Sequence, residues 1–219
     1  MRSRDVHSQL RVLYTRMIES GLSVKQNWPK ERAMPAGGVA IGDLPATAMA
    51  LRDIEYHLLY READRTDCYH MKLPDGGLIT FQYCFNGDDE LEKHRLAYFP
   101  SPHLPTIDEA PYLYERDEMF ADLMLTRLVR FPIRFDYDPT NHRDVIHPKT
   151  HLTLGQFDNC RIPVVAPLLP NTFLKFLLRN FYYRSYVRNL NRFERHLPGS
   201  RQTETITIAE RRISHVLMV

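Results

Sequence analysis

The sequence predicts one α+β domain over residues 1–219: an antiparallel, strongly twisted sheet of about six or seven strands, packed against an N-terminal helix and one long C-terminal helix. Three observations predict this class. Apolar residues recur at three- and four-residue spacing near the N-terminus, short runs with alternating apolar residues follow, and a long proline-initiated apolar stretch lies near the C-terminus. No internal repeat or linker divides the chain, so a single domain is the simplest arrangement.

The N-terminal helix is indicated by apolar residues that share one helical face, and Gly21 is its expected C-terminal stop. These residues are Val6, Leu10, Leu13, Tyr14, Met17 and Ile18. From 25 to 44, prolines, glycines and charges surround the single Trp28, which predicts an irregular segment. One helical turn is expected at 46–51.

A meander of strands is expected next. Residues 54–61 and 68–73 are rich in β-formers, and the Pro-Asp-Gly-Gly sequence at 74–77 favours a tight turn. Beyond it, every second residue from 79 to 85 is apolar, as in a strand with one buried face, and 93–99 is the fourth run.

The second half continues the sheet. Alternation at 131–137 predicts a strand, and Pro132 within it indicates an edge or a bulge, because proline cannot donate to the ladder. The other expected elements are a loop at 100–111, a short helix at 117–125, and strands at 152–154, 161–165, 205–208 and 213–219, the last joining the sheet.

The long C-terminal helix is expected from Pro170 to about Leu197, since proline suits the first helical position and Pro198-Gly199 would end it. Its first half is apolar nearly all round. Its second half carries four arginines opposite an apolar face. This arginine stripe consists of Arg184, Arg188, Arg192 and Arg195. It could follow a nucleic-acid backbone, with nearby tyrosines stacking on bases, or be a solvated face paired with carboxylates.

Composition and cysteine usage point to a cytoplasmic protein. Hydrophobic residues make up 43% and charged residues 26%, and the net charge is only +2, so bulk charge does not require a nucleic-acid partner. The three cysteines, Cys68, Cys84 and Cys160, have no metal-ligand spacing and are expected to be reduced. Neither a signal peptide nor a membrane-spanning stretch is recognisable, so no membrane partner is expected.

The stretch from 136 to 161, called here the histidine stretch, is the most promising place for a site. It holds three of the ten histidines within ten positions, together with cationic side chains. These residues are His142, Arg143, His147, Lys149, His151 and Arg161. They could form a basic pocket for phosphate, since arginine offers a planar donor fork and histidine a pH-dependent one. The alternative is that the histidines cap turns and satisfy buried carbonyls.

A metal site is a weaker interpretation of the same stretch. Asp136, Asp138 and the three histidines supply enough donors. However, Pro148 disfavours a helix that would bring His147 and His151 together, and no glutamate lies between them. No metal or cofactor is therefore expected.

Phosphodiester chemistry is another possibility. The sequence His-Leu-Thr-Leu at 151–154 resembles one half of the H-x-T signature of the two-histidine phosphoesterases. The second candidate, Ser-His-Val-Leu at 214–217, lacks the threonine or serine two places after its histidine. In this hypothesis His147 and His151 are the catalytic acid and base, and Arg161 steadies the developing charge.

Four segments together resemble an uncharacterised bacterial family of single-domain proteins, a domain of unknown function. They are RFDYDP at 134–139, HPKTHLTLG at 147–155, CRIPV at 160–164 and FLKFLLRNFY at 173–182. The resemblance covers the C-terminal half. It implies a bacterial cytoplasmic protein from a defence or mobile-element neighbourhood, and it implies no activity.

The leading expectation is therefore a bacterial cytoplasmic binding module that recognises nucleic acid or nucleotide through the histidine stretch and the arginine stripe. It would serve as an accessory component of a defence or toxin–antitoxin system. The alternatives are a phosphodiesterase or ribonuclease, and a protein–protein adaptor that binds a partner from the same operon through its apolar C-terminal strand.

Overall fold

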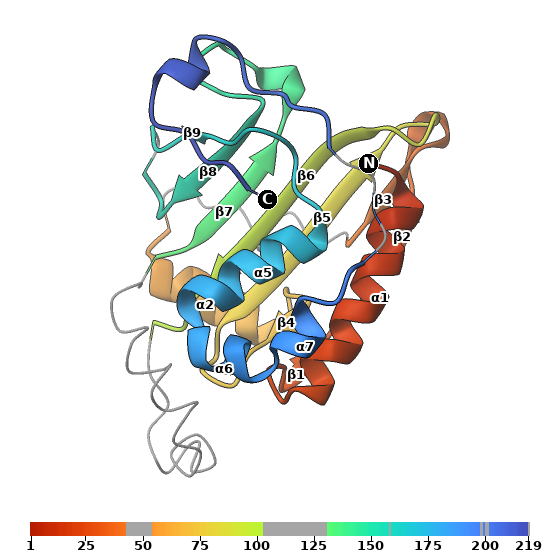
Figure 1. Cartoon of the computed structure of the whole chain (residues 1–219), viewed down its shortest axis with the longest axis vertical. Helices are drawn as coiled ribbons and strands as arrows, with labels where there is room; N and C mark the ends of the chain where they lie inside the picture. The colour runs from red at the N-terminus through yellow and green to blue at the C-terminus, as the bar shows by residue number, and fades with distance from the viewer. Residues whose placement is uncertain (43–53, 103–130, 158, 198, 200–201, 219) are drawn as a thin grey trace.

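A nine-stranded antiparallel sheet runs through the part of the chain that the structure describes (Figure 1). The structure is a computed structural model, and the described residues are 1–42, 54–102, 131–157, 159–197, 199 and 202–218. The main path is β1-β4-β5-β6-β7-β8-β9, with β3 pairing β5 and β2 pairing β3. The strands are β1 (Lys25–Gln26), β2 (Glu31–Ala33), β3 (Val39–Ile41), β4 (Met71–Lys72), β5 (Leu78–Phe85), β6 (Leu91–Phe99), β7 (Ile133–Tyr137), β8 (Thr150–Leu154) and β9 (Ile162–Pro163).

Helices at both ends of the chain lie over one face of this sheet (Figure 1). The described helices are α1 (Ser3–Glu19), α2 (Tyr56–Arg65), α5 (Pro170–Phe181), α6 (Tyr183–Arg188) and α7 (Leu190–Phe193). Short 3-10 turns are η1 (Pro35–Gly37), η4 (Pro139–Asn141) and η5 (Glu210–Arg212). The predicted α+β class, with an N-terminal helix and an antiparallel sheet, is confirmed. The helical turns expected at 46–51 and 117–125 lie outside the described residues.

The main core lies between the sheet and α1 and α5. Phe81 on β5 and Phe135 on β7 are fully buried on this face, as is Leu13 on α1. Phe173 on α5 meets both sheet phenylalanines edge to face, with ring centroids 5.8 and 5.9 Å away. Full burial of each such side chain stabilises the folded protein by roughly 1.5–3 kcal/mol.

The opposite face of the sheet has two different parts. At one end Leu78, Ala97 and Phe99 pack against Leu59 and Ala63 of α2 in a second apolar cluster. Because neighbouring residues in a strand face opposite ways, the polar residues between the core positions of β6, β7 and β8 also lie on this face. The candidate site is built from these polar residues.

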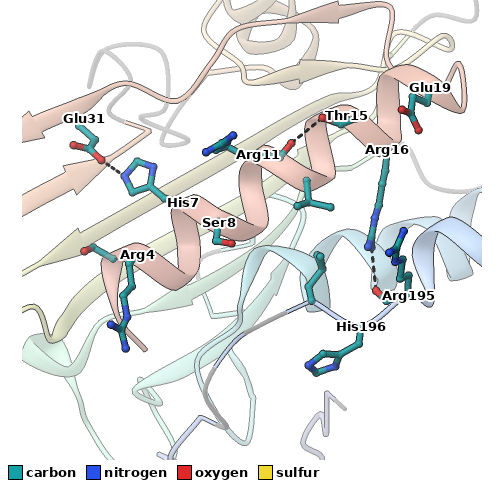
Figure 2. A pocket seen from close by; sticks show the side chains of 13 residues that line it. Arg4, His7, Ser8, Arg11, Thr15, Arg16, Glu19, Glu31, Arg195 and His196 are labelled. Carbon is teal, nitrogen blue, oxygen red and sulfur yellow. Dashed lines mark hydrogen bonds and ion pairs between the residues drawn. The ribbon is translucent and has the colours of Figure 1, made fainter.

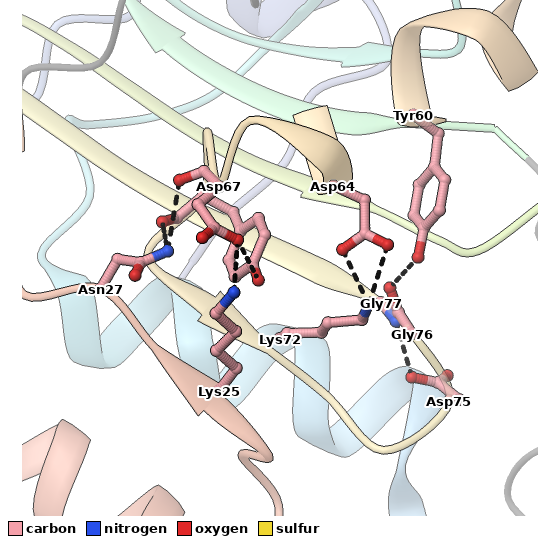
Figure 3. Close-up of polar contacts among 10 residues, drawn as sticks. Lys25, Asn27, Tyr60, Asp64, Asp67, Lys72, Asp75, Gly76 and Gly77 are labelled. Atoms are coloured by element: carbon pink, nitrogen blue, oxygen red, sulfur yellow. Dashed lines mark hydrogen bonds and ion pairs between the residues drawn. The ribbon is translucent and has the colours of Figure 1, made fainter. Parts of the chain in front are cut away.

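Ion pairs and hydrogen bonds fasten β1 and α2 to the neighbouring strands and turns (Figure 3). Lys25 of β1 lies 2.6 Å from an Asp67 carboxylate oxygen, and Lys72 of β4 lies 2.7 Å from one of Asp64. The Tyr60 hydroxyl donates to the Gly76 carbonyl at 2.5 Å. These contacts hold α2 over the β4–β5 turn.

Two predictions in the first half of the chain are wrong. Residues 25–44 were expected to be irregular, yet β1, β2 and β3 form there. Residues 54–61 were expected to be a strand, yet most of them form the start of α2. The physical reason is spacing: Leu59, Tyr60 and Ala63 are the buried positions, three or four residues apart, and this period outweighs their β-propensity.

The predicted long helix is three short helices. The first ends at Phe181, and Tyr182 leaves helical geometry with φ −132° and ψ 42°. A second break falls at Asn189, with φ −108° and ψ 24°. The buried Tyr182 hydroxyl donates to Asp75 at 2.6 Å and lies 2.8 Å from the hydroxyl of Tyr98, which fixes the ring at the first break.

The edge position expected for the strand at 131–137 is wrong as well. Strand β7 lies between β6 and β8, and Pro132 precedes it, so its missing N–H costs no ladder bond. Residues 205–208 form no strand, although the Thr205 N–H donates to the Val165 carbonyl at 2.8 Å. In the described part of the C-terminal segment, a parallel bridge joins Val216 to Val164 beside β9.

Among the described helices, none combines the length and the apolar character that crossing a bilayer requires.

Candidate anion-binding site

Sheet register brings four charged or titratable side chains together on the face opposite α1 and α5. Arg95 of β6 pairs with Asp136 of β7, and Asp136 pairs with His151 of β8. Arg134 lies two residues before Asp136 on the same strand and therefore on the same face. Three strands thus place two guanidinium groups, a carboxylate and an imidazole side by side.

Asp136 is the buried centre of this group, with 4% of its surface exposed. Its two oxygens accept from Arg95 Nε at 3.0 Å and from Arg134 Nε at 2.5 Å. Burial alone would raise the pKa of Asp136, but the charges of Arg134 and Arg95 outweigh it and hold the pKa below its ordinary value. The carboxylate is therefore ionised and holds both arginines in fixed positions.

His151 of β8 links Asp136 to the connection between β7 and β8. Its Nδ1–H donates to the Pro148 carbonyl at 2.9 Å, and its Nε2 lies 3.7 Å from Asp136 Oδ2. Burial lowers the pKa of His151, and only 2% of the residue is exposed. The ring is therefore neutral near pH 7, and it contacts buried neighbours instead of solvent.

His147 lies beside His151, with the ring centroids 4.8 Å apart and the planes at 68°. Burial lowers the pKa of His147, and the nearby charge of Arg161 lowers it further. Within the described part of the chain, its Nδ1 has no hydrogen-bond partner. This half-buried ring is the histidine of the pair that a ligand could reach.

The connection between β7 and β8 contains a tight turn that holds His147 beside the cavity. Arg143 and His147 exchange two backbone hydrogen bonds, of 3.0 and 2.7 Å. Between them Val145 has a φ of +67°, a conformation that β-branched residues rarely adopt. Asp138 accepts from Asn141 Nδ2 at 2.9 Å and from Lys93 Nζ at 3.2 Å, which ties the connection to β6.

These side chains line a basic cavity of about 520 Å³. Its described lining residues are Lys93, Arg95, Arg134, Asp136, Asp138, Thr140, Asn141, His142, Arg143, Ile146, His147, His151 and Arg161. Five are lysine or arginine and only two are acidic, and both acids already have cationic partners. The cavity therefore has a surplus of positive charge suited to an anion.

Most of the predicted histidine-stretch residues meet in the basic cavity. His142, Arg143, His147, His151 and Arg161 line it, whereas Lys149 does not. Three further lining residues from β6 and β7 were not predicted from the sequence: Lys93, Arg95 and Arg134. The available signal was the alternation at 131–137, which places Arg134 on the same face as Asp136.

The carboxylates considered as metal ligands have other partners. Two arginines occupy Asp136, and Lys93 and Asn141 occupy Asp138. Among the described residues, neither carboxylate belongs to a group of side chains close enough to share a metal ion with the histidines.

The arginine stripe lies elsewhere and is divided among two helices and a loop. Arg184 and Arg188 are exposed on α6, and Arg192 of α7 forms an ion pair with Glu19 of α1. Arg195 follows α7 and lies beside a groove along α1. None of the four lines the basic cavity.

The groove along α1 is a second basic surface (Figure 2). It has a volume of about 970 Å³, and no described residue lines both it and the basic cavity. Arg4, Ser8, Arg11 and Thr15 line it from one face of α1, and Arg195 lines it from the other wall. Arg16 also lines the groove, and its guanidinium group donates to the Arg195 carbonyl at 3.2 Å, which links the two walls.

The fold and site define an α+β protein with a basic cavity on the sheet face opposite its two main helices. The chain belongs to the protein family DUF2290, described as an uncharacterized conserved protein, and the match covers residues 22–218. The relationship thus includes all nine strands and extends well beyond the C-terminal half. The chain matches no curated protein and no solved structure.

Proposed function

We propose that this protein is a binding module for a phosphate-bearing partner, nucleic acid or nucleotide, and that the basic cavity holds the phosphate. The observation that carries the proposal is the charge of the cavity wall. Arg143 and Arg161 line it and, among the described residues, form no ion pair with a carboxylate. Their guanidinium groups offer planar forks of donors that match phosphate oxygens.

The deeper wall supports the same ligand class. Asp136 fixes Arg95 and Arg134, and one carboxylate cannot neutralise two guanidinium groups. Arginines fixed in this way lose little side-chain entropy when an anion binds, which favours affinity. His147 adds a donor when its unpartnered nitrogen is protonated.

The proposal includes a cellular role as an accessory component of a bacterial defence or toxin–antitoxin system. This role is what the sequence resemblance implied, and neither the family description nor a residue of the cavity specifies it. Co-purification of nucleic acid, nucleotide or a second chain from the same operon would test it.

The binding test uses fluorescence anisotropy with labelled, 5′-phosphorylated single-stranded RNA and DNA, and with nucleotides as competitors. Arg143→Ala and Arg161→Ala should each weaken binding by about tenfold to a hundredfold, since a charge-assisted contact is worth roughly 1.5–3 kcal/mol. Arg65→Ala is the matched control, because Arg65 is exposed and pairs with Glu62 on α2. Unchanged affinity in both cavity variants would contradict the proposal.

Phosphodiester hydrolysis is the second candidate function, and one observation favours it. The rings of His147 and His151 lie 4.8 Å apart and line the same cavity as Arg161. In this proposal a water molecule attacks phosphorus and gives its proton to the neutral His147 ring, while the bond to the leaving oxygen breaks. His151 holds the His147 ring in place, and Arg161 stabilises the negative charge on the phosphate oxygens. If His147→Ala and His151→Ala leave hydrolysis of bis(p-nitrophenyl) phosphate unchanged, the two histidines are not the catalytic pair and this second proposal is wrong.

A further inference from the structure

A second group of side chains lies at the rim of the basic cavity and is suited to a cation. Ligand atoms of His142, Asp144 and Glu210 all lie within 4.8 Å of one another. We propose that these three residues bind one divalent transition-metal ion, Zn²⁺ or Mn²⁺. His142 also lines the basic cavity, but metal binding by these three residues does not depend on the phosphate-binding proposal.

The spacing of the closest pair fits coordination. His142 Nε2 and Glu210 Oε1 are 3.4 Å apart. Two ligands bound tetrahedrally to zinc at about 2.0–2.1 Å are separated by about 3.3 Å, so this pair needs little movement to share an ion. The exposed Asp144 carboxylate on the same connection can close onto the ion as the third ligand.

The burial of Glu210 is an independent reason to expect a cation. Only 1% of Glu210 is exposed, and no described lysine or arginine lies within ion-pair distance of it. Asp136, the other buried carboxylate at this end of the sheet, has two arginine partners. A buried carboxylate without a cation is costly, and a metal ion would remove that cost.

Thr207 provides the supporting contacts that metal ligands commonly have. Its N–H donates to Glu210 Oε2 at 2.9 Å, and its hydroxyl donates to Asp144 Oδ1 at 2.5 Å. Both carboxylates are thereby oriented by one residue while keeping an oxygen for the ion. The bound ion would fasten η5 to the β7–β8 connection, where His142 follows η4.

The ligand types decide which ion is expected. One imidazole nitrogen and two carboxylates suit zinc or manganese, whereas magnesium and calcium prefer oxygen ligands alone. Three protein ligands leave at least one coordination position for water or another ligand.

The test uses the full chain after treatment with a chelator, with Zn²⁺ or Mn²⁺ added as the chloride salt alone. Equilibrium dialysis should give about one bound equivalent, and thermal unfolding should move to higher temperature as the ion is added. His142→Gln and Asp144→Asn should each weaken metal binding at least tenfold and remove the shift in unfolding temperature. Glu204→Gln is the control, because it removes a carboxylate from the same segment that instead pairs with Arg211.

Circular dichroism would confirm that the variants fold. Asp144 is exposed, so its substitution should leave the fold intact even if a change at the buried Glu210 does not. The inference is overturned if the wild-type chain binds no stoichiometric Zn²⁺ or Mn²⁺. It is equally overturned if the folded Asp144→Asn and His142→Gln variants bind the ion as tightly as the wild type.

Discussion

Asp136 is the residue on which the geometry of the basic cavity most depends, because its carboxylate holds both Arg95 and Arg134. Asp136→Asn should destabilise the protein by about 3–5 kcal/mol, since it leaves two guanidinium groups without their buried counter-charge. Urea denaturation at neutral pH measures this loss. Asp138→Asn on the same side should cost less than about 1 kcal/mol, because the side chain of its partner Lys93 is about half exposed to solvent.

The same pair of arginines predicts a pH window. The pKa of Asp136 is lower in the folded protein than its ordinary value of 3.8. Its contribution to stability is therefore present above about pH 4 and disappears as the pH falls below that value. An Asp136→Asn variant that kept the full loss of stability below pH 4 would contradict this assignment.

Two buried histidines predict a second loss of stability as the pH falls, in a range above that of Asp136. His70 Nδ1 accepts the Phe81 N–H, and His94 Nε2 accepts the Leu168 N–H, both at 3.0 Å. Burial lowers the pKa of each from 6.5 to about 4, so the unfolded chain gains protons that the folded chain excludes. Stability should fall between pH 6.5 and 4 by up to about 1.4 kcal/mol per pH unit for each histidine.

The check is a series of urea denaturations across that pH range. His94→Gln retains an acceptor that does not titrate. The slope of unfolding free energy against pH should therefore decrease by the contribution of one of the two histidines. A slope equal to that of the wild type would show that His94 is not the titrating group.

At the residue scale, the sequence located part of the site. The density of charge and imidazole between 136 and 161 identified five lining residues of the cavity. Arg95 and Lys93 could not be identified, because only the pairing of β6 with β7 places them beside Asp136. That pairing joins residues about forty positions apart, and no local pattern encodes it.

At the scale of elements, the break between α5 and α6 shows how tertiary contacts override a helical pattern. Tyr182 interrupts a sequence of good helix formers because its hydroxyl reaches the buried Asp75 and Tyr98. The same competition explains α2, where packing on the sheet decided between a strand and a helix. The alternation of apolar and polar residues predicted β5 and β7 correctly, since the two faces of each strand meet different neighbours.

Removing that hydroxyl tests its role. Tyr182→Phe should destabilise the protein by about 1.5–3 kcal/mol, because a buried carboxylate loses a donor. Tyr183→Phe is the matched control, since Tyr183 is 61% exposed and should change stability by less than about 0.5 kcal/mol. Equal stability of the two variants in urea denaturation would show that the Asp75 contact is not stabilising.

At the scale of the whole molecule, the sheet separates the two basic surfaces. The basic cavity lies on the face opposite α1 and α5, and the groove runs along α1 itself. The sequence predicted that the histidine stretch and the arginine stripe would both contact the ligand, and it placed the stripe on a single long helix. Breaks at Tyr182 and Asn189 divide it, and none of its arginines lines the cavity.

The most direct test of the central claim is the salt dependence of binding to a 5′-phosphorylated single-stranded RNA. Affinity should fall as the salt concentration rises, and the slope should decrease by about one for each of Arg143→Ala and Arg161→Ala. Arg11→Ala and Arg195→Ala, in the α1 groove, should leave the slope unchanged. A slope that responds only to Arg11 and Arg195, or the absence of salt-sensitive binding to RNA, DNA and nucleotides, would contradict the assignment of the cavity.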